Sequence, residues 1–410
     1  MKILCVFGKH NYGNPARGLS YEFANFLPAL HCLGHETLHF ESWDKGAHPN
    51  FAHLNRAFLE SVESAQPDII FCVLMHYELW LETLQEVRKR CNTLIIHWGT
   101  DDSWKYEQFA RWVAPAFDIY ATTSSEALVK SRKDGLGNFV LTQWGANSAN
   151  LAKPLPAAQC QYQVSFIGSA YGNRRRWVSS LRGRGIDVAC FGYGWENGPV
   201  KSEDISEIIR NSIISLNFGD SGLHLQGFGV QRSRQIKARV FEVPGAGGFL
   251  LTEDAPYLKD FYIPGKEVVV FNTVDDLCEK LGFFLTHPEQ RDAIAKAGYE
   301  RTLKEHTYEH RFRSLFDSAI QSCVDTGRPT PPKSCKFDDQ WFAELKGRHE
   351  MGSFLRLLKC GLIKVFSIVW GRERGTRAAR RLIYELSWRL SPGRTYTSAG
   401  IPGRMFYQES

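Results

Sequence analysis

The chain has 410 residues, which is too long for one ordinary hydrophobic core and sufficient for two domains and a tail. Its composition of 43% hydrophobic and 23% charged residues excludes an intrinsically disordered chain. The formal net charge of +6 is small for this length and does not indicate a nucleic-acid partner.

The first half of the chain alternates short apolar runs with amphipathic stretches. Strands are predicted at residues 3–7, 37–40, 69–74, 93–97 and 118–122, and a helix at 21–33 that ends at Gly34. The run at 69–74 is continuously apolar, as is typical of a parallel strand buried on both faces. The alternation predicts a Rossmann-like, acceptor-side domain over residues 1–150, with a parallel sheet between helices.

Pro154, Pro156 and several alanines interrupt this rhythm and predict a linker at residues 151–162. A second alternating series follows, with strands predicted at 164–167, 188–191, 213–217, 248–251 and 268–271. It indicates a second Rossmann-like domain over residues 163–326. Open α/β sheets bind ligands at the carboxyl ends of their strands, so two such sheets place the binding cleft between them.

A Pro-rich segment at residues 327–332 separates this series from a basic, partly helical extension, residues 327–410. Apolar residues recur at helical spacing from Leu355 to Val369, and basic residues interrupt and follow them. Residues 353–390 therefore predict one of two arrangements. They form a basic amphipathic helix at an anionic membrane surface, or a helical extension packed on the other domains. No recognised nucleic-acid motif accompanies the charge.

The ten cysteines indicate a reducing compartment, because none stands in a Cys-x-x-Cys pair or near a histidine cluster with zinc spacing. The apolar start of the chain is too short for a signal peptide, and no apolar run is long enough to cross a bilayer. We expect a cytoplasmic protein, with peripheral attachment to the inner face of the membrane as the alternative.

The most informative segment is residues 235–253. Arg239 and Glu242 lie three residues apart and share one face of a predicted helix. Pro244, Gly247 and Gly248 then end the helix and let the backbone approach a ligand. The carboxylate can accept hydrogen bonds from a ribose diol, and the guanidinium can pair with a diphosphate. The alternative is a surface ion pair followed by a Gly-rich turn.

A second candidate anion site follows the apolar strand at 164–167. Gly168 and Gly172 would let the backbone close on a diphosphate, Arg174 would add charge, and the predicted helix at 175–181 would direct its N-terminus there. The alternative is a plain turn between a strand and a helix. The pattern is not Gly-x-Gly-x-x-Gly, so a nicotinamide cofactor is not indicated.

Two segments of the first half are predicted to face the cleft. Asp101 or Asp102 can position an acceptor hydroxyl or act as a base, while the other caps the following helix. His97 precedes them, and Trp98 either stacks on a sugar ring or belongs to the core. Gly13 lies in an early loop, residues 10–17, that is either a cleft loop or an ordinary turn.

Three stretches of the second half resemble the C-terminal domain of the CgeB-like glycosyltransferases, relatives of the retaining glycosyltransferase family 4. They are residues 166–174, residues 238–242 with the glycines that follow, and residues 305–311, in the expected order. The resemblance implies a GT-B fold, in which two Rossmann-like domains face a central cleft. It also implies hexosyl transfer from a nucleoside-diphosphate sugar, with retention, to a glycan, protein or lipid-linked acceptor. No metal and no further cofactor are implied.

The resemblance also assigns roles. The carboxylate before the Gly-rich turn holds the ribose in this group, and that residue is Glu242 here. In our own interpretation of the segment, Arg174, Lys237 or Arg239 lies near the diphosphate. Asn217, after a strand of the second domain, would touch the base or the sugar. We take Asp101, Asp102 and Arg239 as the catalytic candidates.

The group often carries a second glutamate eight residues before the first, and that position is Arg234 here. This departure keeps a non-catalytic nucleotide-sugar-binding or scaffold protein open as an alternative. A nucleotide-sugar epimerase on the same fold is the other alternative.

Overall fold

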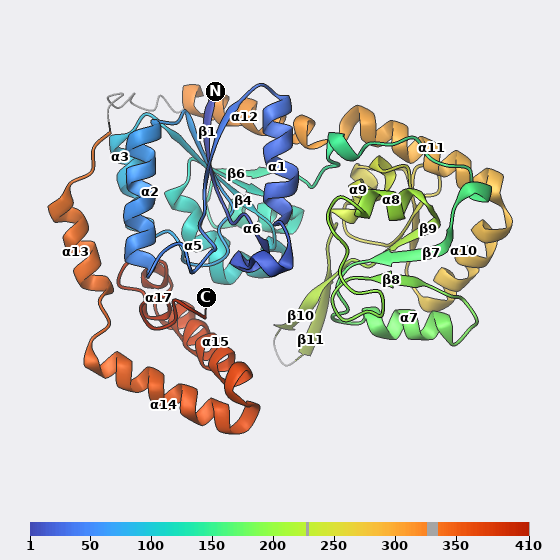
Figure 1. Ribbon diagram of the computed structural model, residues 1–410. Helices are drawn as coiled ribbons and strands as arrows, with labels where there is room; N and C mark the ends of the chain where they lie inside the picture. The colour runs from blue at the N-terminus through green and yellow to red at the C-terminus, as the bar shows by residue number, and fades with distance from the viewer. Residues whose placement is uncertain (227–228, 326–334, 410) are drawn as a thin grey trace.

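The computed structural model describes residues 1–226, 229–325 and 335–409, and Figure 1 shows two α/β lobes side by side. We call them the N-terminal lobe, whose sheet lies within residues 2–141, and the C-terminal lobe, whose sheet lies within residues 162–271. The predicted Pro-rich segment at 327–332 lies outside the described residues.

The N-terminal lobe is built on a parallel six-stranded sheet of order β2-β1-β3-β4-β5-β6 within the described residues. The predicted strands are confirmed, and β6 is an addition. Their bounds are β1 (Lys2–Val6), β2 (Glu36–Phe40), β3 (Ile69–Cys72), β4 (Leu94–Gly99), β5 (Ile119–Thr122) and β6 (Phe139–Leu141). Short helices lie between β4 and β6: α4 (Asp102–Lys105), α5 (Arg111–Val113) and α6 (Ser125–Lys133).

Alternate residues of these strands face two different helix layers. Leu4 and Ile70 pack towards α2 (Phe51–Ala65) and α3 (Leu81–Arg90), whereas Ile3 packs towards α1 (Tyr21–Cys32). Helix α1 begins where the Oγ of Ser20 accepts a hydrogen bond from the N–H of Phe23 at 3.1 Å. The sheet is thus buried on both faces, as its apolar strands predict.

The C-terminal lobe has a parallel sheet of order β13-β12-β9-β7-β8 within the described residues. Helices α7 (Arg174–Arg182) and α10 (Val274–Thr286) cover one face, and α8 (Ile205–Arg210) and α9 (Arg239–Gly245) cover the other. The five predicted strands are confirmed as β7 (Tyr162–Ile167), β8 (Ala189–Phe191), β9 (Ser212–Asn217), β12 (Leu250–Glu253) and β13 (Val269–Phe271). The antiparallel pair β10 (Asp220–Gln226) and β11 (Gly229–Arg234) is an addition.

Helix α11 (Pro288–Glu305) leads to α12 (Tyr308–Asp325), which returns to the N-terminal lobe. The sequence places α12 inside the predicted nucleotide-binding range 163–326. Its apolar residues Phe312 and Phe316 nevertheless pack in the N-terminal core with Phe26 and Phe71. The helix has an apolar stripe to bury, and the face of the first sheet beside α1 receives it.

The chain therefore connects the lobes twice. The first connection includes Ala146, and the second includes the link between α11 and α12. The two run side by side: the N–H of Ala146 donates to the carbonyl of His306 at 2.8 Å, and the N–H of Tyr308 donates to the carbonyl of Ala146 at 3.0 Å.

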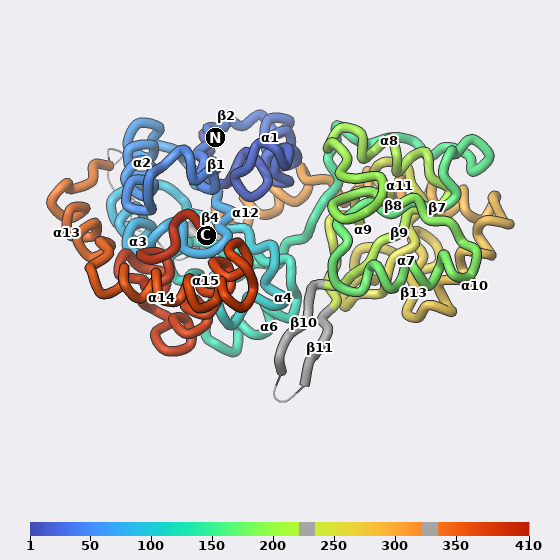
Figure 2. The backbone as a smooth tube through the Cα atoms, turned by 60° about the horizontal axis from the view of Figure 1, so that its bottom comes forward, coloured from blue at the N-terminus to red at the C-terminus, as the bar shows by residue number. Residues whose placement is uncertain are grey.

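The C-terminal extension is helical and lies against the N-terminal lobe (Figures 1 and 2). Phe342, Leu345 and Tyr396 join the N-terminal core. The helices are α13 (Asp339–His349), α14 (Ser353–Trp370), α15 (Arg372–Leu390), α16 (Pro392–Thr395) and α17 (Ile401–Met405).

Candidate functional site

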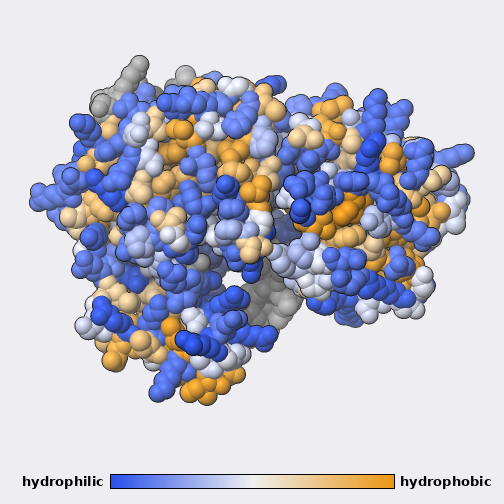
Figure 3. Space-filling model, in the orientation of Figure 1, coloured by the Kyte–Doolittle hydropathy of each residue, from blue (hydrophilic) through white to orange (hydrophobic). Residues whose placement is uncertain are grey.

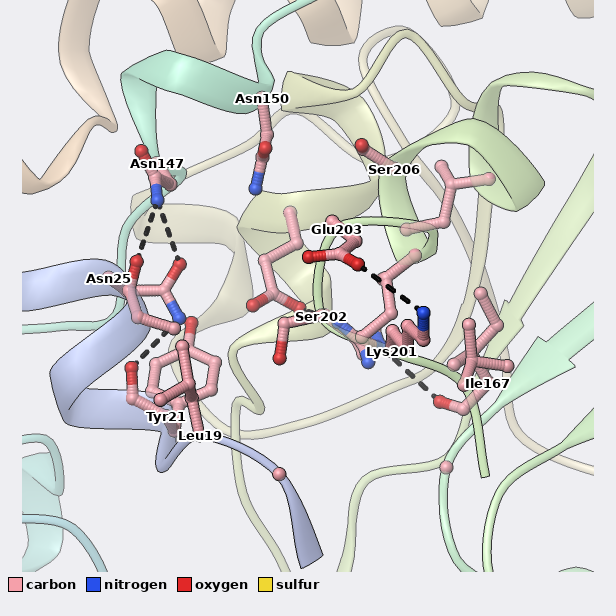
Figure 4. A pocket seen from close by; sticks show the side chains of 18 of the residues that line it. Leu19, Tyr21, Asn25, Asn147, Asn150, Ile167, Lys201, Ser202, Glu203 and Ser206 are labelled. Atoms are coloured by element: carbon pink, nitrogen blue, oxygen red, sulfur yellow. Dashed lines mark hydrogen bonds and ion pairs between the residues drawn. The ribbon is translucent and has the colours of Figure 1, made fainter. Parts of the chain in front are cut away.

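A cavity of about 710 Å³ lies between the two lobes, within the range of roughly 300–1,000 Å³ that is usual for small-molecule sites. One wall is drawn from residues 11–28 of the N-terminal lobe. The facing wall is drawn from residues 167–169, 192–209 and 239–246 of the C-terminal lobe. Residues 146–150 of the first connection complete the lining, and Figure 4 shows Asn147 hydrogen-bonded to Asn25 of α1.

Arg239 and Glu242 lie on the C-terminal wall, in helix α9. Their side chains form an ion pair and are mostly buried. The Nε of Arg239 also donates to the carbonyl of Ile167 at 3.3 Å, which ties the pair to the end of β7. The two residues share one helix face, as their spacing predicts, and they line the cavity instead of an open surface.

Two tyrosines connect this carboxylate to the N-terminal lobe. The hydroxyls of Tyr21, from α1, and Tyr308, from α12, are 2.8 Å apart. Burial raises the pKa of both phenols well above the ordinary value, and the nearby Glu242 carboxylate raises each pKa further. Both hydroxyls therefore stay protonated, and the hydroxyl of Tyr21 is a donor towards Glu242. The sequence does not single out Tyr21, and it marks Tyr308 only as part of the stretch 305–311.

The turn after β7 holds a buried guanidinium. Gly168 and Ser169 line the cavity, and Gly172 has a positive φ of 60° that favours glycine. Arg174 is only 7% exposed: it donates to the carbonyl of Ser169 at 2.9 Å and to the hydroxyl of Tyr171 at 3.0 Å. Burial lowers the pKa of Arg174, and the guanidinium is held as a fixed positive charge beside the turn.

A second cation, Lys237, lies close to Arg174. The pKa of Lys237 is lowered to about 8, chiefly by burial; Asp101 and Asp220 oppose this shift and the charge of Arg174 adds to it. Asp101 comes from the N-terminal lobe and is 3.8 Å from the Nζ of Lys105. The structure thus brings Asp101, Lys237 and Arg174 near one another although they are far apart in the sequence.

Three candidates from the first lobe, His97, Trp98 and Asp102, are buried, which corrects the predicted cleft position of His97 and favours the core alternative for Trp98. Strand β4 continues to Gly99, so His97 and Trp98 lie inside the sheet and not beyond its end. Trp98 has an exposed fraction of 0%, and His97 stacks on Tyr120 with ring centroids 4.6 Å apart. Burial lowers the pKa of His97 to about 3, so the ring is neutral at pH 7.

Asp102 is buried as well. It accepts a hydrogen bond from the hydroxyl of Tyr120 at 3.0 Å, and burial raises its pKa to about 6. Its side chain therefore points into the N-terminal core. Asp101 occupies the N-cap position of α4, but its side chain makes no capping hydrogen bond. Of the two predicted carboxylates, Asp101 is the one near the cationic cluster of the C-terminal lobe.

Three predicted glycines serve close packing. A Cβ on Gly13 would lie 2.2 Å from the carbonyl oxygen of Trp43, and one on Gly247 would lie 2.5 Å from the carbonyl oxygen of Ala152. A Cβ on Gly248 would meet Ile209 at 2.5 Å. A side chain at any of these three positions would therefore collide with protein atoms, and their predicted approach to a ligand stays a prediction.

Asn217 is also buried. Its side-chain amide donates to the Oγ1 of Thr252 at 2.9 Å and joins the ends of β9 and β12. This geometry corrects the predicted contact of Asn217 with a base or sugar, because the side chain is used inside the lobe.

Comparisons with known proteins give the fold. The profile of a family described as "Glycosyl transferase-like" matches residues 174–317. A sucrose-phosphate synthase structure from Thermosynechococcus elongatus covers 79% of this chain and 100% of its own, at 11% identity and a TM-score of 0.57. The Anabaena protein Alr3699/HepE in complex with UDP and glucose covers 78% and 100%, at 11% identity and a TM-score of 0.54. A glycosyltransferase from Rickettsia africae covers 78% and 98%, at 11% identity and a TM-score of 0.53.

This chain has the GT-B fold. Its two parallel-sheet lobes and the cavity between them are the GT-B arrangement, and the family match lies in the C-terminal lobe and α12. No curated protein sequence matches the chain.

Arg234 stands at the position where the resembled group often has a glutamate. The Nε of Arg234 lies 3.1 Å from Glu253, whose side chain is fully buried at the end of β12. The other oxygen of Glu253 accepts the N–H of Gly219 at 3.0 Å. Arg234 therefore neutralises a buried carboxylate, a role that the sequence does not reveal because Glu253 is 19 residues further along.

Some residues of the cavity carry no sequence motif. Ser202, Glu203 and Ser206 come from the loop after β8 and the start of α8, and Figure 4 shows them on the C-terminal side of the cavity. In the parts of the chain that the structure describes, no group of three or more His, Cys, Asp or Glu side chains is placed to hold a metal ion.

Proposed function

We propose that this chain is a glycosyltransferase of the CgeB-like kind that moves a hexose from a nucleoside-diphosphate sugar to an acceptor. The observation that carries the proposal is the cavity between the GT-B lobes, because it places the Arg239–Glu242 pair and the turn at Gly168 on one wall. Structures of the same fold were solved with UDP, and with UDP and glucose. A uridine diphosphate sugar is therefore the first donor to test.

In this proposal the C-terminal lobe holds the donor. Glu242 accepts hydrogen bonds from the ribose, and Arg239 orients Glu242 through their ion pair. Arg174 and Lys237, which lie beside the turn at Gly168 and Gly172, neutralise the diphosphate as it leaves. These cations are already desolvated, so little solvent must rearrange when charge develops on the leaving group.

The N-terminal lobe supplies the acceptor side. Asp101 is the candidate for positioning or deprotonating an acceptor hydroxyl, because Asp102 points into the core. The acceptor is a glycan, a protein or a lipid-linked sugar. Transfer with retention is proposed from the resemblance to the retaining family alone.

One observation favours a second candidate function, a nucleotide-sugar-binding protein without transfer activity. The ion pair between Arg234 and Glu253 puts a guanidinium where the resembled group often has a glutamate. A protein that kept the donor pocket and lost this carboxylate would bind donors without turning them over.

We also propose that the protein works at the inner face of a membrane and contacts it through residues 353–390. This segment holds nine Lys and Arg and two Glu, a net charge of +7. The remaining 372 residues therefore sum to −1, so the positive charge of the protein is concentrated in one segment. An anionic surface attracts such a segment.

The donor site is tested by incubating the protein with UDP-, GDP-, ADP- and TDP-sugars and measuring nucleotide release and donor affinity. Glu242→Gln keeps the size of the side chain and removes the charge, so we expect weaker donor binding and loss of release. Glu60→Gln is the matched control, because Glu60 pairs with Arg56 on the exposed face of α2.

Release from one donor class that Glu242→Gln abolishes supports the transferase site. Saturable binding without release, weakened by Glu242→Gln, supports the binding protein instead. Equal behaviour of Glu242→Gln and Glu60→Gln contradicts the assignment of the donor site.

A further inference from the structure

Helix α14 leaves its apolar residues exposed. None of its 18 residues, all of which the structure describes, is buried, although the sequence of the helix is predominantly apolar. Phe354, Leu357 and Ile368 are 76%, 78% and 79% exposed. Soluble proteins rarely leave a contiguous apolar surface of this kind uncovered, so it indicates an interaction site.

Five of the exposed residues form one face of the helix. Phe354, Leu357, Gly361, Val365 and Ile368 follow one another at intervals of three or four residues, which places them along one stripe. We call these five residues the outer face of α14. Figure 3 shows hydrophobic atoms exposed at the end of the molecule where α14 and α15 lie.

The other side of α14 already has a partner inside the chain. Leu355, Leu362 and Phe366 pack against a small apolar cluster that includes Ala379 of α15 and Phe406. The hairpin of α14 and α15 is thus held together by its inner side, and nothing in the fold requires the outer face to be apolar.

The positive charge of the neighbouring helix α15 indicates what binds the outer face of α14. Basic side chains of α15 form a second stripe, Arg374, Arg377 and Arg381, at the same three- and four-residue spacing, and all three are exposed. A second copy of this chain would bring a like charge of +7 against the first and be repelled. An anionic bilayer offers the opposite charge and an apolar interior at one surface.

The geometry fits a helix that lies in the membrane plane. Helix α14 is about 27 Å long at ~1.5 Å per residue, but Arg356, Lys359 and Lys364 lie along it. No helix among the described residues is long and apolar enough to span a bilayer. A helix with one apolar face and interspersed basic residues binds at the boundary of headgroups and acyl chains.

We propose that α14 inserts its outer face into an anionic lipid surface, while the basic residues of the α14–α15 hairpin contact the headgroups. This inference rests on the membrane contact proposed above and is independent of the transferase chemistry.

The test is co-sedimentation of the full chain with vesicles of phosphatidylcholine alone and with vesicles of phosphatidylcholine mixed with phosphatidylserine, which is anionic. We expect binding to the anionic vesicles only, and weaker binding at high salt. The triple variant Phe354→Ser, Leu357→Ser, Ile368→Ser should lower the partition coefficient at least about tenfold. These side chains are exposed, so the variant should melt like the wild type.

The matched control replaces three exposed apolar residues elsewhere, Val129→Ser, Ile263→Ser and Leu303→Ser, and should bind like the wild type. If the wild type binds anionic vesicles and the α14 variant binds equally well, α14 is not the inserted element. If the wild type binds no vesicles, the membrane contact itself is wrong. If it self-associates in solution and the α14 variant does not, the outer face is an interface between copies and the inference is overturned. Donor binding measured on the same preparations reports separately on the transferase site.

Discussion

The partly buried ammonium of Lys237 makes the proposed nucleotide binding depend on pH. Burial lowers its pKa to about 8 in the empty site, against an ordinary value of 10.5. A bound diphosphate stabilises the charged form, so binding takes up a proton wherever Lys237 is neutral beforehand. Affinity should therefore be flat below pH 8 and fall as the pH rises above it.

The size of the effect follows from one titrating group. With a pKa of about 8, roughly nine-tenths of the lysine is charged at pH 7 and roughly one-tenth at pH 9. The dissociation constant for UDP should then rise about tenfold between these pH values, which is about 1.4 kcal/mol. The terminal phosphate of UDP is already about nine-tenths ionised at pH 7 and changes little up to pH 9, since such groups titrate near pH 6.

Isothermal titration calorimetry with UDP at pH 7, 8 and 9 measures this dependence. Lys237→Arg keeps its charge throughout the range and should bind with the same affinity at all three values. Lys237→Met should bind weakly and also without pH dependence. A tenfold loss that persists in both variants would refute the reasoning, because another group would then carry the proton.

Further outcomes follow from the packing and charges of single residues. Below pH 8 the desolvated charge of Lys237 lowers the stability of the fold. Lys237→Met should therefore raise the melting temperature of the ligand-free protein at pH 7. This gain should shrink as the pH rises from 8 towards 10.5, because the lysine is then neutral in the folded protein. Trp98→Ala should lower the free energy of unfolding by about 3–5 kcal/mol in urea titrations, because the ring is fully buried. Arg234→Met removes the ion-pair partner of the buried Glu253 and should lower the free energy of unfolding by about 3–5 kcal/mol, again in urea titrations. If the double variant Arg234→Met, Glu253→Gln regains this stability, the lost ion pair is the cause. Gly247→Ala should lower the melting temperature, since φ is 78° there and the new methyl group would collide with Ala152; a substitution without effect would contradict the packing argument.

The two sheets could be predicted from the sequence because burial on both faces leaves a continuous apolar run. The stretch from Ile69 to Cys72 shows this, since every residue in it is buried. Strand β6 has only three residues, and its last residue, Leu141, is exposed, so no such run marks it. The return of α12 to the N-terminal lobe could not be predicted either, because an apolar stripe on a helix does not determine which sheet the helix packs against.

The same distinction between local and tertiary relations holds for the residues of the candidate site. Arg239 and Glu242 could be predicted because their spacing on one helix fixes their relation locally. His97 and Trp98 could not be placed, since a strand that runs two residues longer turns a cleft position into a core position. Tyr21 meets Tyr308 only through the tertiary fold, across 287 residues of chain.

The paired connections between the lobes bear on motion. Ala146 and its neighbours His306 and Tyr308 hold the two crossings together through backbone hydrogen bonds, and a Cβ on Gly145 would already lie 2.9 Å from Thr307. Two crossings fastened at one place act as a single hinge, so the lobes swing about one axis and do not drift apart. Tyr21 lies on one lobe and Glu242 on the other, so under the proposed function a donor bound at Glu242 would favour closure of the cleft about this axis. Opening the same hinge would then be the step that releases the spent nucleotide.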